Sequence, residues 1–275
     1  MSVTSSLVVL GLLSAAPICQ AATPAVEEAV AHIARAADGE VGVVIHPATE
    51  RARFLTLPGA GLKVAGGPAE EVAAAFLREH GDAVGVADPD RQLRLRRVDV
   101  DDLGRTHVRY TQVHRGVPVF AGQLKVHLDA RGRVHVVNGT IIPDLEKLET
   151  VPGRTSAQAG RVAVGHVAGQ GVRSASWYSG KARLVVYRTG LARRVAGRAH
   201  LAWEVEVLGD PGMRELVYVD AHTGKVVDQI SGATDTLFRR VYDGEASYPA
   251  SPFWTEGDVF PTGDAAADAL IAFSE

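Results

Sequence analysis

The sequence predicts an α+β fold of two consecutive modules, each a helix packed on an antiparallel meander sheet, followed by an extended C-terminal tail. Three observations carry this prediction. A helical pattern followed by a run of strand patterns occurs twice along the chain. Both runs contain a similar hairpin sequence, VHLDARGRVHVVNG at 126–139 and VYVDAHTGKVVDQISG at 217–232. Between the runs, Pro143 and Pro152 bracket a charged stretch that is typical of a domain boundary.

The first module opens with an Ala-rich, weakly helical segment at 22–40 and two short strands around a turn at 40–61. Its clearest helix lies at 66–81. Pro68 suits the first turn of that helix, acidic residues favour the positive end of its dipole, and Gly81 ends it. Four strand patterns follow, at 93–100, 106–113, 117–129 and 133–142.

The second module repeats this order. Thr155 or Ser156 caps a helix predicted at Ala157–Val167. Four strand patterns then follow, at 182–188, 200–209, 215–221 and 225–232. In the two similar hairpins, Asp129 and Asp220 end the first arm, and Gly132 and Gly224 supply the positive φ that such turns require. The shared order favours two related halves, with convergence of two ordinary hairpins as the alternative.

An export signal is predicted at residues 1–21. An apolar run at Leu7–Leu13 is followed by small residues, and Ala21 would be the last residue before cleavage, although no Lys or Arg precedes the run. The run is too short for the about 20 apolar residues that cross a membrane. Cleavage would remove Cys19, the single cysteine, so the mature chain would have no disulfide and no thiolate ligand. A lipid-anchored Cys19 is the alternative.

Composition and net charge limit the classes of partner that the chain can have. The chain has 275 residues, 46% of them hydrophobic, and a net charge of −3, so no overall basic field indicates a nucleic-acid partner. Charge does vary along the chain, since residues 91–99 are locally basic and the final forty residues are acidic. We interpret both stretches as solvated surface.

No catalytic constellation is found in the sequence. Ten histidines are present, but none lies in an HExxH motif, and GxSxG, Walker A and GxGxxG motifs are absent from the sequence. His127 and His135 flank a turn and could face each other, yet two imidazoles without a third ligand make a weak zinc site. An acidic cluster at 99–102 fits a solvated turn better than a calcium loop. We therefore expect no catalytic or metal-binding residue in this chain.

Two stretches carry a family resemblance. Residues 108–145 resemble the FTP-type propeptides of secreted thermolysin-family and fungalysin-type zinc metallopeptidases, and residues 201–232 resemble their second, PepSY-type propeptide module. Ala121 intervenes before, or replaces, the glycine that the family places after its Gly-Val-Pro-Val-Phe turn. The positions that carry the match are Tyr110, Gln112, Gly116, Pro118, Gly122, Trp203, Asp220 and Gly224.

The resemblance implies a zymogen pro-region that acts as an intramolecular chaperone and inhibitor, with the cognate metalloprotease catalytic domain as its partner. Residues 233–275 resemble the opening of a mature protease, and the HExxH helix of the family lies beyond that point. We therefore expect a chain truncated before the catalytic helix, with no cofactor of its own. Zinc and calcium are expected only in the missing catalytic domain. Maturation is expected in the joint that contains Gly232, Asp235, Arg239 and Arg240.

The predicted organisation has five parts. They are a signal peptide at 1–21, an N-terminal extension at 22–52, an FTP-like module at 53–145, a PepSY-like module at 146–232, and a linker with the start of a protease domain at 233–275. A secreted or periplasmic bacterial protein with no membrane or nucleic-acid partner after signal cleavage is expected. The alternatives are a stand-alone secreted protease inhibitor acting in trans and an enzyme with an unfamiliar site.

Overall fold

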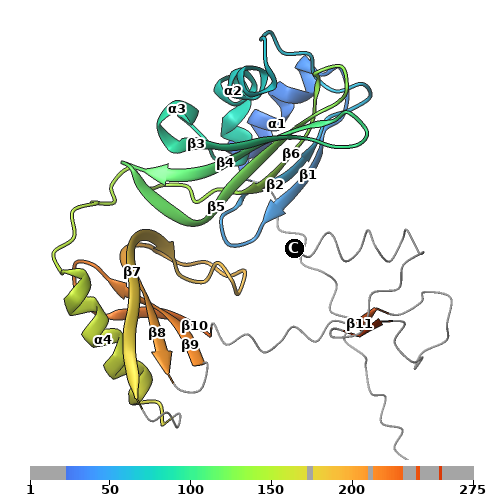
Figure 1. Cartoon of the computed structure of the whole chain (residues 1–275). Helices are drawn as coiled ribbons and strands as arrows, with labels where there is room; N and C mark the ends of the chain where they lie inside the picture. The colour runs from blue at the N-terminus through green and yellow to red at the C-terminus, as the bar shows by residue number, and fades with distance from the viewer. Residues whose placement is uncertain (1–22, 172–175, 210–212, 232–239, 242–253, 256–275) are drawn as a thin grey trace, which may run out of the picture.

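The computed structural model describes residues 23–171, 176–209 and 213–231, together with two short strands at 240–241 and 254–255 (Figure 1). In each module helices precede a run of antiparallel strands, which is an α+β fold and confirms the predicted class. The predicted helices and strands lie within a few residues of the observed ones, with the largest difference at the strand expected at 182–188, which begins at Trp177. Of the predicted C-terminal tail, the structure describes only the pairing of Arg240–Val241 (β11) with Trp254–Thr255 (β12).

The first module contains six strands and the helices that cover one face of their sheet (Figure 1). The strand order is β1-β2-β6-β5, with β4 and then β3 continuing on the other side of β5, and every pair is antiparallel. The elements are α1 (Pro24–Ala36), β1 (Gly42–His46), β2 (Arg51–Thr56), α2 (Ala69–His80), η1 (Gly81–Val84), α3 (Pro89–Gln92), β3 (Leu93–Val100), β4 (Thr106–His114), β5 (Val117–Leu128) and β6 (Val134–Thr140).

One hydrophobic core joins these elements. Phe76 and Leu77 of α2 are fully buried and belong to the same cluster as Leu124 and Val126 of β5. Each such side chain contributes roughly 1.5–3 kcal/mol by leaving water. Ile33 of α1 and Ala52 of β2 are buried in the same cluster, so residues that precede position 53 contribute to this core. The domain boundaries themselves stay a prediction.

The second module is a four-stranded antiparallel sheet with one helix on one face. Ala159, Ala163 and Val167 of the helix pack against valines of the sheet. A capping box closes the start of the helix, because Thr155 accepts from the backbone of Gln158 and the Gln158 side chain accepts from the backbone of Thr155. The elements are α4 (Ser156–Ala168), β7 (Trp177–Arg188), β8 (Ala199–Gly209), β9 (Met213–Asp220) and β10 (Val226–Ser231).

The two sheets meet along β5. Val119 pairs in parallel with Val186 of β7, so one strand serves both modules. The next residue, Phe120, places its ring 5.3 Å from the rings of both Tyr187 and Tyr218, which stack on each other at 3.9 Å. Aromatic pairs at these separations add to the stabilisation that burial provides. The two modules are therefore joined by an apolar seam and not only by the chain between them.

Candidate functional site

The motif residues of β4 and β5 build a junction rather than a reactive site. The Gln112 side chain is 1% exposed and makes two hydrogen bonds to the backbone of Ile142: its Nε2 donates to the carbonyl oxygen at 2.7 Å, and its Oε1 accepts from the N–H at 2.9 Å. A Cβ at position 122 would lie 2.7 Å from the Cβ of Gln112, so only glycine fits beside this amide. Ala121 takes the positive φ of 57° that glycine tolerates better.

The other motif positions of the first module are also structural. Tyr110 is buried, its hydroxyl donates to the carbonyl of Glu70 in α2 at 3.5 Å, and burial raises its pKa to about 12. Gly116, at φ 84°, closes the tight turn between β4 and β5. Pro118 lies exposed near the start of β5. These positions fix the path of the chain from α2 through β4 into β5.

In the second module the motif positions hold the linker that precedes α4. The Trp203 indole donates to the carbonyl of Arg154 at 2.8 Å, and the Arg154 N–H donates to the carbonyl of Ala221 at 2.8 Å. Asp220 accepts from the backbone of Thr223 at 2.7 Å, and its other oxygen lies 2.9 Å from His200 Nδ1. These contacts attach the linker to the hairpin turn that the sequence singled out.

The turn motif occurs a third time, at a place the sequence analysis missed. Asp101 accepts from the backbone N–H groups of Leu103 and Arg105 at 3.0 and 2.8 Å, as Asp129 does from Arg131 and Arg133 at 2.8 and 2.9 Å. These backbone hydrogen bonds lower the pKa of both carboxyl groups. The shared spacing Asp-x-x-Gly-Arg, DDLGR beside DARGR, was the signal that could have found it.

Several predicted site residues fall outside the described part of the chain. They are the cleavage position Ala21 and the processing positions Gly232, Asp235 and Arg239. Arg240 lies in β11, where it pairs with Thr255.

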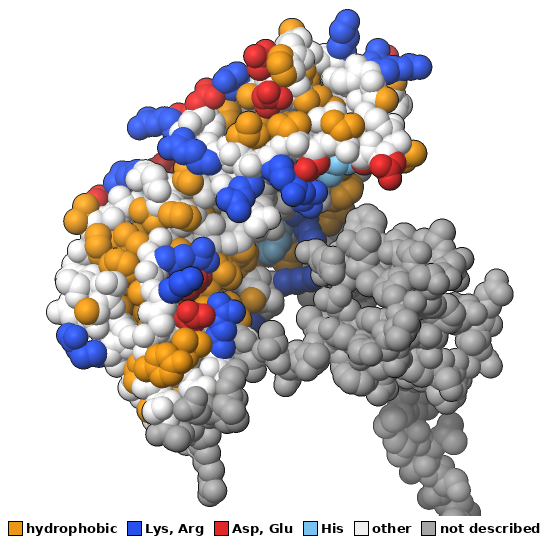
Figure 2. Space-filling view, in the orientation of Figure 1, with side chains coloured by type: hydrophobic (Ala, Val, Ile, Leu, Met, Phe, Trp, Pro, Cys, Tyr) orange, Lys and Arg blue, Asp and Glu red, His pale blue; other side chains and the backbone are white. Residues whose placement is uncertain are grey.

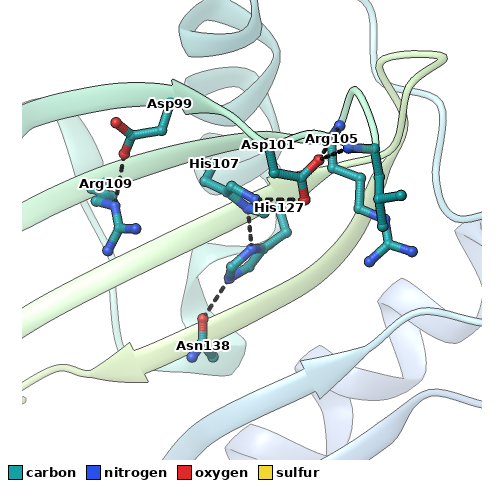
Figure 3. Close-up of polar contacts among 8 residues, drawn as sticks. Asp99, Asp101, Arg105, His107, Arg109, His127 and Asn138 are labelled. Carbon is teal, nitrogen blue, oxygen red and sulfur yellow. Dashed lines mark hydrogen bonds and ion pairs between the residues drawn. The ribbon is translucent and has the colours of Figure 1, made fainter. Parts of the chain in front are cut away.

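The face of the first sheet opposite α1 and α2 carries a polar cluster (Figure 3). It comes from neighbouring strands: Asp99 on β3, His107 and Arg109 on β4, and His127 on β5. Asp99 accepts from Arg109 Nε at 2.9 Å and from Arg97 Nε at 2.8 Å. These are partly exposed ion pairs, which solvent and salt screen.

A chain of four polar groups crosses this face. Asp101 Oδ2 lies 3.2 Å from His107 Nε2, His107 Nδ1 lies 2.6 Å from His127 Nδ1, and His127 Nε2 lies 2.7 Å from Asn138 Oδ1 (Figure 3). A contact as short as that between the two rings has room for one proton, so both Nδ1 atoms cannot carry a hydrogen at once. Burial lowers the pKa of His127, and the charges of His107, Lys125 and Arg109 lower it further. The hydrogen bond to Asn138 acts in the opposite direction and raises the pKa.

The suggestion that His127 faces His135 was wrong. Cross-strand register places His127 opposite His107 on one side and Val136 on the other. A bulge between His127 and Leu128 shifts the pairing, so the two histidines of this hairpin are not partners. His135 instead lines the same cavity of about 380 Å³ that His107, His127 and Asn138 border.

The described residues contain no group of three or more His, Cys, Asp or Glu side chains placed to hold a metal ion. No described helix is long and apolar enough to cross a membrane.

Two family profiles match the chain. Residues 91–141 match the Fungalysin/Thermolysin Propeptide Motif (FTP), and residues 178–230 match the Peptidase propeptide and YPEB domain (PepSY). The chain carries an FTP module followed by a PepSY module. The FTP match begins near β3, so α1, β1, β2 and α2 precede it although they share the core of the FTP module.

Curated relatives agree with this assignment. The chain is 30% identical over 165 residues to thermolysin of Alicyclobacillus acidocaldarius subsp. acidocaldarius, covering 58% of this chain and 29% of that protein. It is 28% identical over 169 residues to bacillolysin of Bacillus subtilis (strain 168), covering 59% and 31%. The chain therefore spans less than a third of the length of these relatives.

A solved structure is also similar, the Bacillus megaterium YpeB C-terminal domain. The match covers 66% of this chain and 71% of that one at 14% identity. Its TM-score of 0.29 is too low to carry an argument about the fold.

Replacing Gln112 by Leu should lower the free energy of unfolding by about 2–5 kcal/mol, because the buried N–H and carbonyl of Ile142 lose their partners. Urea denaturation followed by circular dichroism measures the change. Gln123→Leu is the matched control, since Gln123 is exposed on the adjacent strand, and it should change stability by less than about 0.5 kcal/mol. Equal effects of the two substitutions would contradict the structural role of Gln112.

Stability should fall as the pH drops from about 7 to 5. Burial lowers the pKa of His46, His80 and His127 below the ordinary value of 6.5, so the unfolded chain binds more protons in this range. The stabilisation that these three histidines provide as neutral side chains is present above pH 6.5. It is lost as the pH falls toward their pKa values in the folded chain. Denaturation at a series of pH values measures the slope, and His127→Gln should make it shallower. A stability that rises on acidification would refute this account.

Proposed function

We propose that this chain is the pro-region of a secreted thermolysin-like zinc metalloendopeptidase, acting as an intramolecular chaperone and inhibitor of the catalytic domain. The observation that carries the proposal is the succession of two propeptide modules, at 91–141 and 178–230, in one chain. Motif residues that hold the fold together, such as Gln112 and Trp203, fit a binding scaffold better than a catalyst.

The physical basis of the chaperone role is mass action. A partner that binds the native surface of a protease, and not its unfolded state, stabilises the native fold. Large proteases pass through aggregation-prone intermediates, and a scaffold present on the same chain reduces that risk. The same contact inhibits the enzyme for as long as it covers the substrate cleft.

Export and maturation complete the proposal. The N-terminal signal would direct the chain out of the cytoplasm, with cleavage after Ala21. Maturation would cut the joint after β10, in the region of Gly232 to Arg240. Zinc and calcium would be bound by the catalytic domain of the precursor and not by the two modules.

The experiment is refolding in trans. A thermolysin-like catalytic domain is denatured and diluted with or without an equimolar amount of the purified chain, and the yield of folded enzyme is measured after removal of the chain. We expect a several-fold higher yield with the chain and reduced peptidase activity before its removal. Gln112→Leu, which loosens the junction, should give a smaller gain, and Gln123→Leu should match the wild type. No change in yield and no inhibition would overturn the proposal.

A second function is favoured by one observation, which is that each module has a hydrophobic core within the described residues. Such a scaffold could act as a stand-alone protease inhibitor in trans. Lasting inhibition of an already folded protease, with no gain in refolding yield, would identify that role.

A further inference from the structure

The open face of the first sheet presents one continuous row of side chains across six strands. Cross-strand register places them side by side as neighbours. In order across the sheet they are Arg97, Arg109, Lys125, Asn138, Phe54 and Val44. The row is basic at the β3 end and apolar at the β1 end, where Phe54 and Val44 are 38% and 53% exposed.

The basic end of this row is not fully neutralised. Asp99 pairs with both Arg97 and Arg109, whereas Lys125 has no ion-pair partner among the described residues. Partial burial and then the charge of Arg109 lower the pKa of Lys125, while the charge of Asp99 acts in the opposite direction. Over residues 91–135, ten Lys and Arg residues stand against four Asp and Glu residues. Figure 2 shows Lys and Arg side chains gathered in several clusters on the visible face of the molecule.

The C-terminal segment of the chain has the opposite character. Residues 242–275 contain seven Asp and Glu residues and no Lys or Arg. Apolar and aromatic residues alternate with these acids, among them Phe260, Leu270 and Phe273. Because Trp254–Thr255 pairs with Arg240–Val241, residues 256–275 set the reach of this segment. At about 3.3 Å per residue they extend roughly 66 Å, whereas a compact module of about 100 residues has a radius of gyration of about 13 Å.

We propose that the open face of the first sheet, along the row from Arg97 to Val44, binds the acidic and apolar segment 242–275 of the same chain. Carboxylates of the segment lie against Lys125 and the neighbouring arginines, and its aromatic residues cover Phe54 and Val44. The contact is within this chain, so it stands independently of the proposed chaperone and inhibitor role. If this contact and the proposed function both hold, the FTP module binds the first residues that follow the pro-region.

The distribution of lysines makes the contact testable. The chain has five lysines, at positions 63, 125, 147, 181 and 225. All except Lys125 are exposed, and Lys125 is only partly exposed. A reagent that joins carboxylates to amines at zero length would therefore favour the other four lysines if the segment moved freely.

The purified full chain is treated with a water-soluble carbodiimide, digested and mapped by mass spectrometry. An equal mixture of ¹⁴N- and ¹⁵N-labelled chains separates links within one chain from links between copies. We expect Lys125 to give the most abundant links to carboxylates of 242–275, within one chain. Raising the salt from 0.1 to 1 M should reduce them at least threefold, because the Debye length falls from about 10 to about 3 Å.

Charge variants sharpen the test. Arg97→Gln leaves the Arg109–Asp99 pair in place and should reduce the Lys125 links at least twofold. Arg161→Gln removes an exposed charge from α4 and should leave them unchanged. If the links involve the exposed lysines and not Lys125, the open face and segment 242–275 are both simply solvated, and the proposal is overturned. Links that form only between copies of the chain would overturn it as well. If the Lys125 links are absent but the chain still raises the refolding yield of the protease, the contact proposed here is wrong and the proposed function stands.

Discussion

The structure depends on one buried amide, that of Gln112, and on the glycine that makes room for it. Gln112 has no partner in the ladder between β4 and β5, because the register moves from Thr111 directly to Val113. Opposite it, residues 119–122 of β5 leave the ladder of the first sheet. Those residues provide the parallel contact to β7 and the ring of Phe120 in the seam. The amide meanwhile holds the backbone of Ile142, which belongs to the apolar cluster at the same junction.

This arrangement explains why a propeptide motif is made of Tyr, Gln and Gly rather than of reactive groups. Under the proposed function the chain presents a fixed surface to a catalytic domain, and a loose scaffold would lose binding free energy because it must become ordered on binding. The motif joins the two modules at a fixed point and leaves one face of the first sheet open. Function, in this account, follows from the rigidity of the junction and from the charges on the open face.

Most of the fold was predictable because alternating strands, an amphipathic helix and Asp-Gly turns leave local signals. The helix at Ala69–His80 and the strand at Leu93–Val100 lie where the pattern placed them. The sequence did not reveal contacts that depend on register. The pairing of His127 with His107 and the addition of β2 to β6 follow from bulges and strand order, which carry no simple pattern. The roles of Gln112 and Gly122 depend on the bulge between Thr111 and Val113, which only the structure reveals.

The central claim is that β5 couples the two modules into one unit, and native-state hydrogen exchange tests it most directly. Amide exchange of the wild-type chain is followed by mass spectrometry at increasing, sub-denaturing urea concentrations. The account predicts that the slowest amides of β4–β6 and of β7–β8 converge on one opening free energy with one urea dependence. Opening of the second module at lower urea, while the first stays protected, would contradict it.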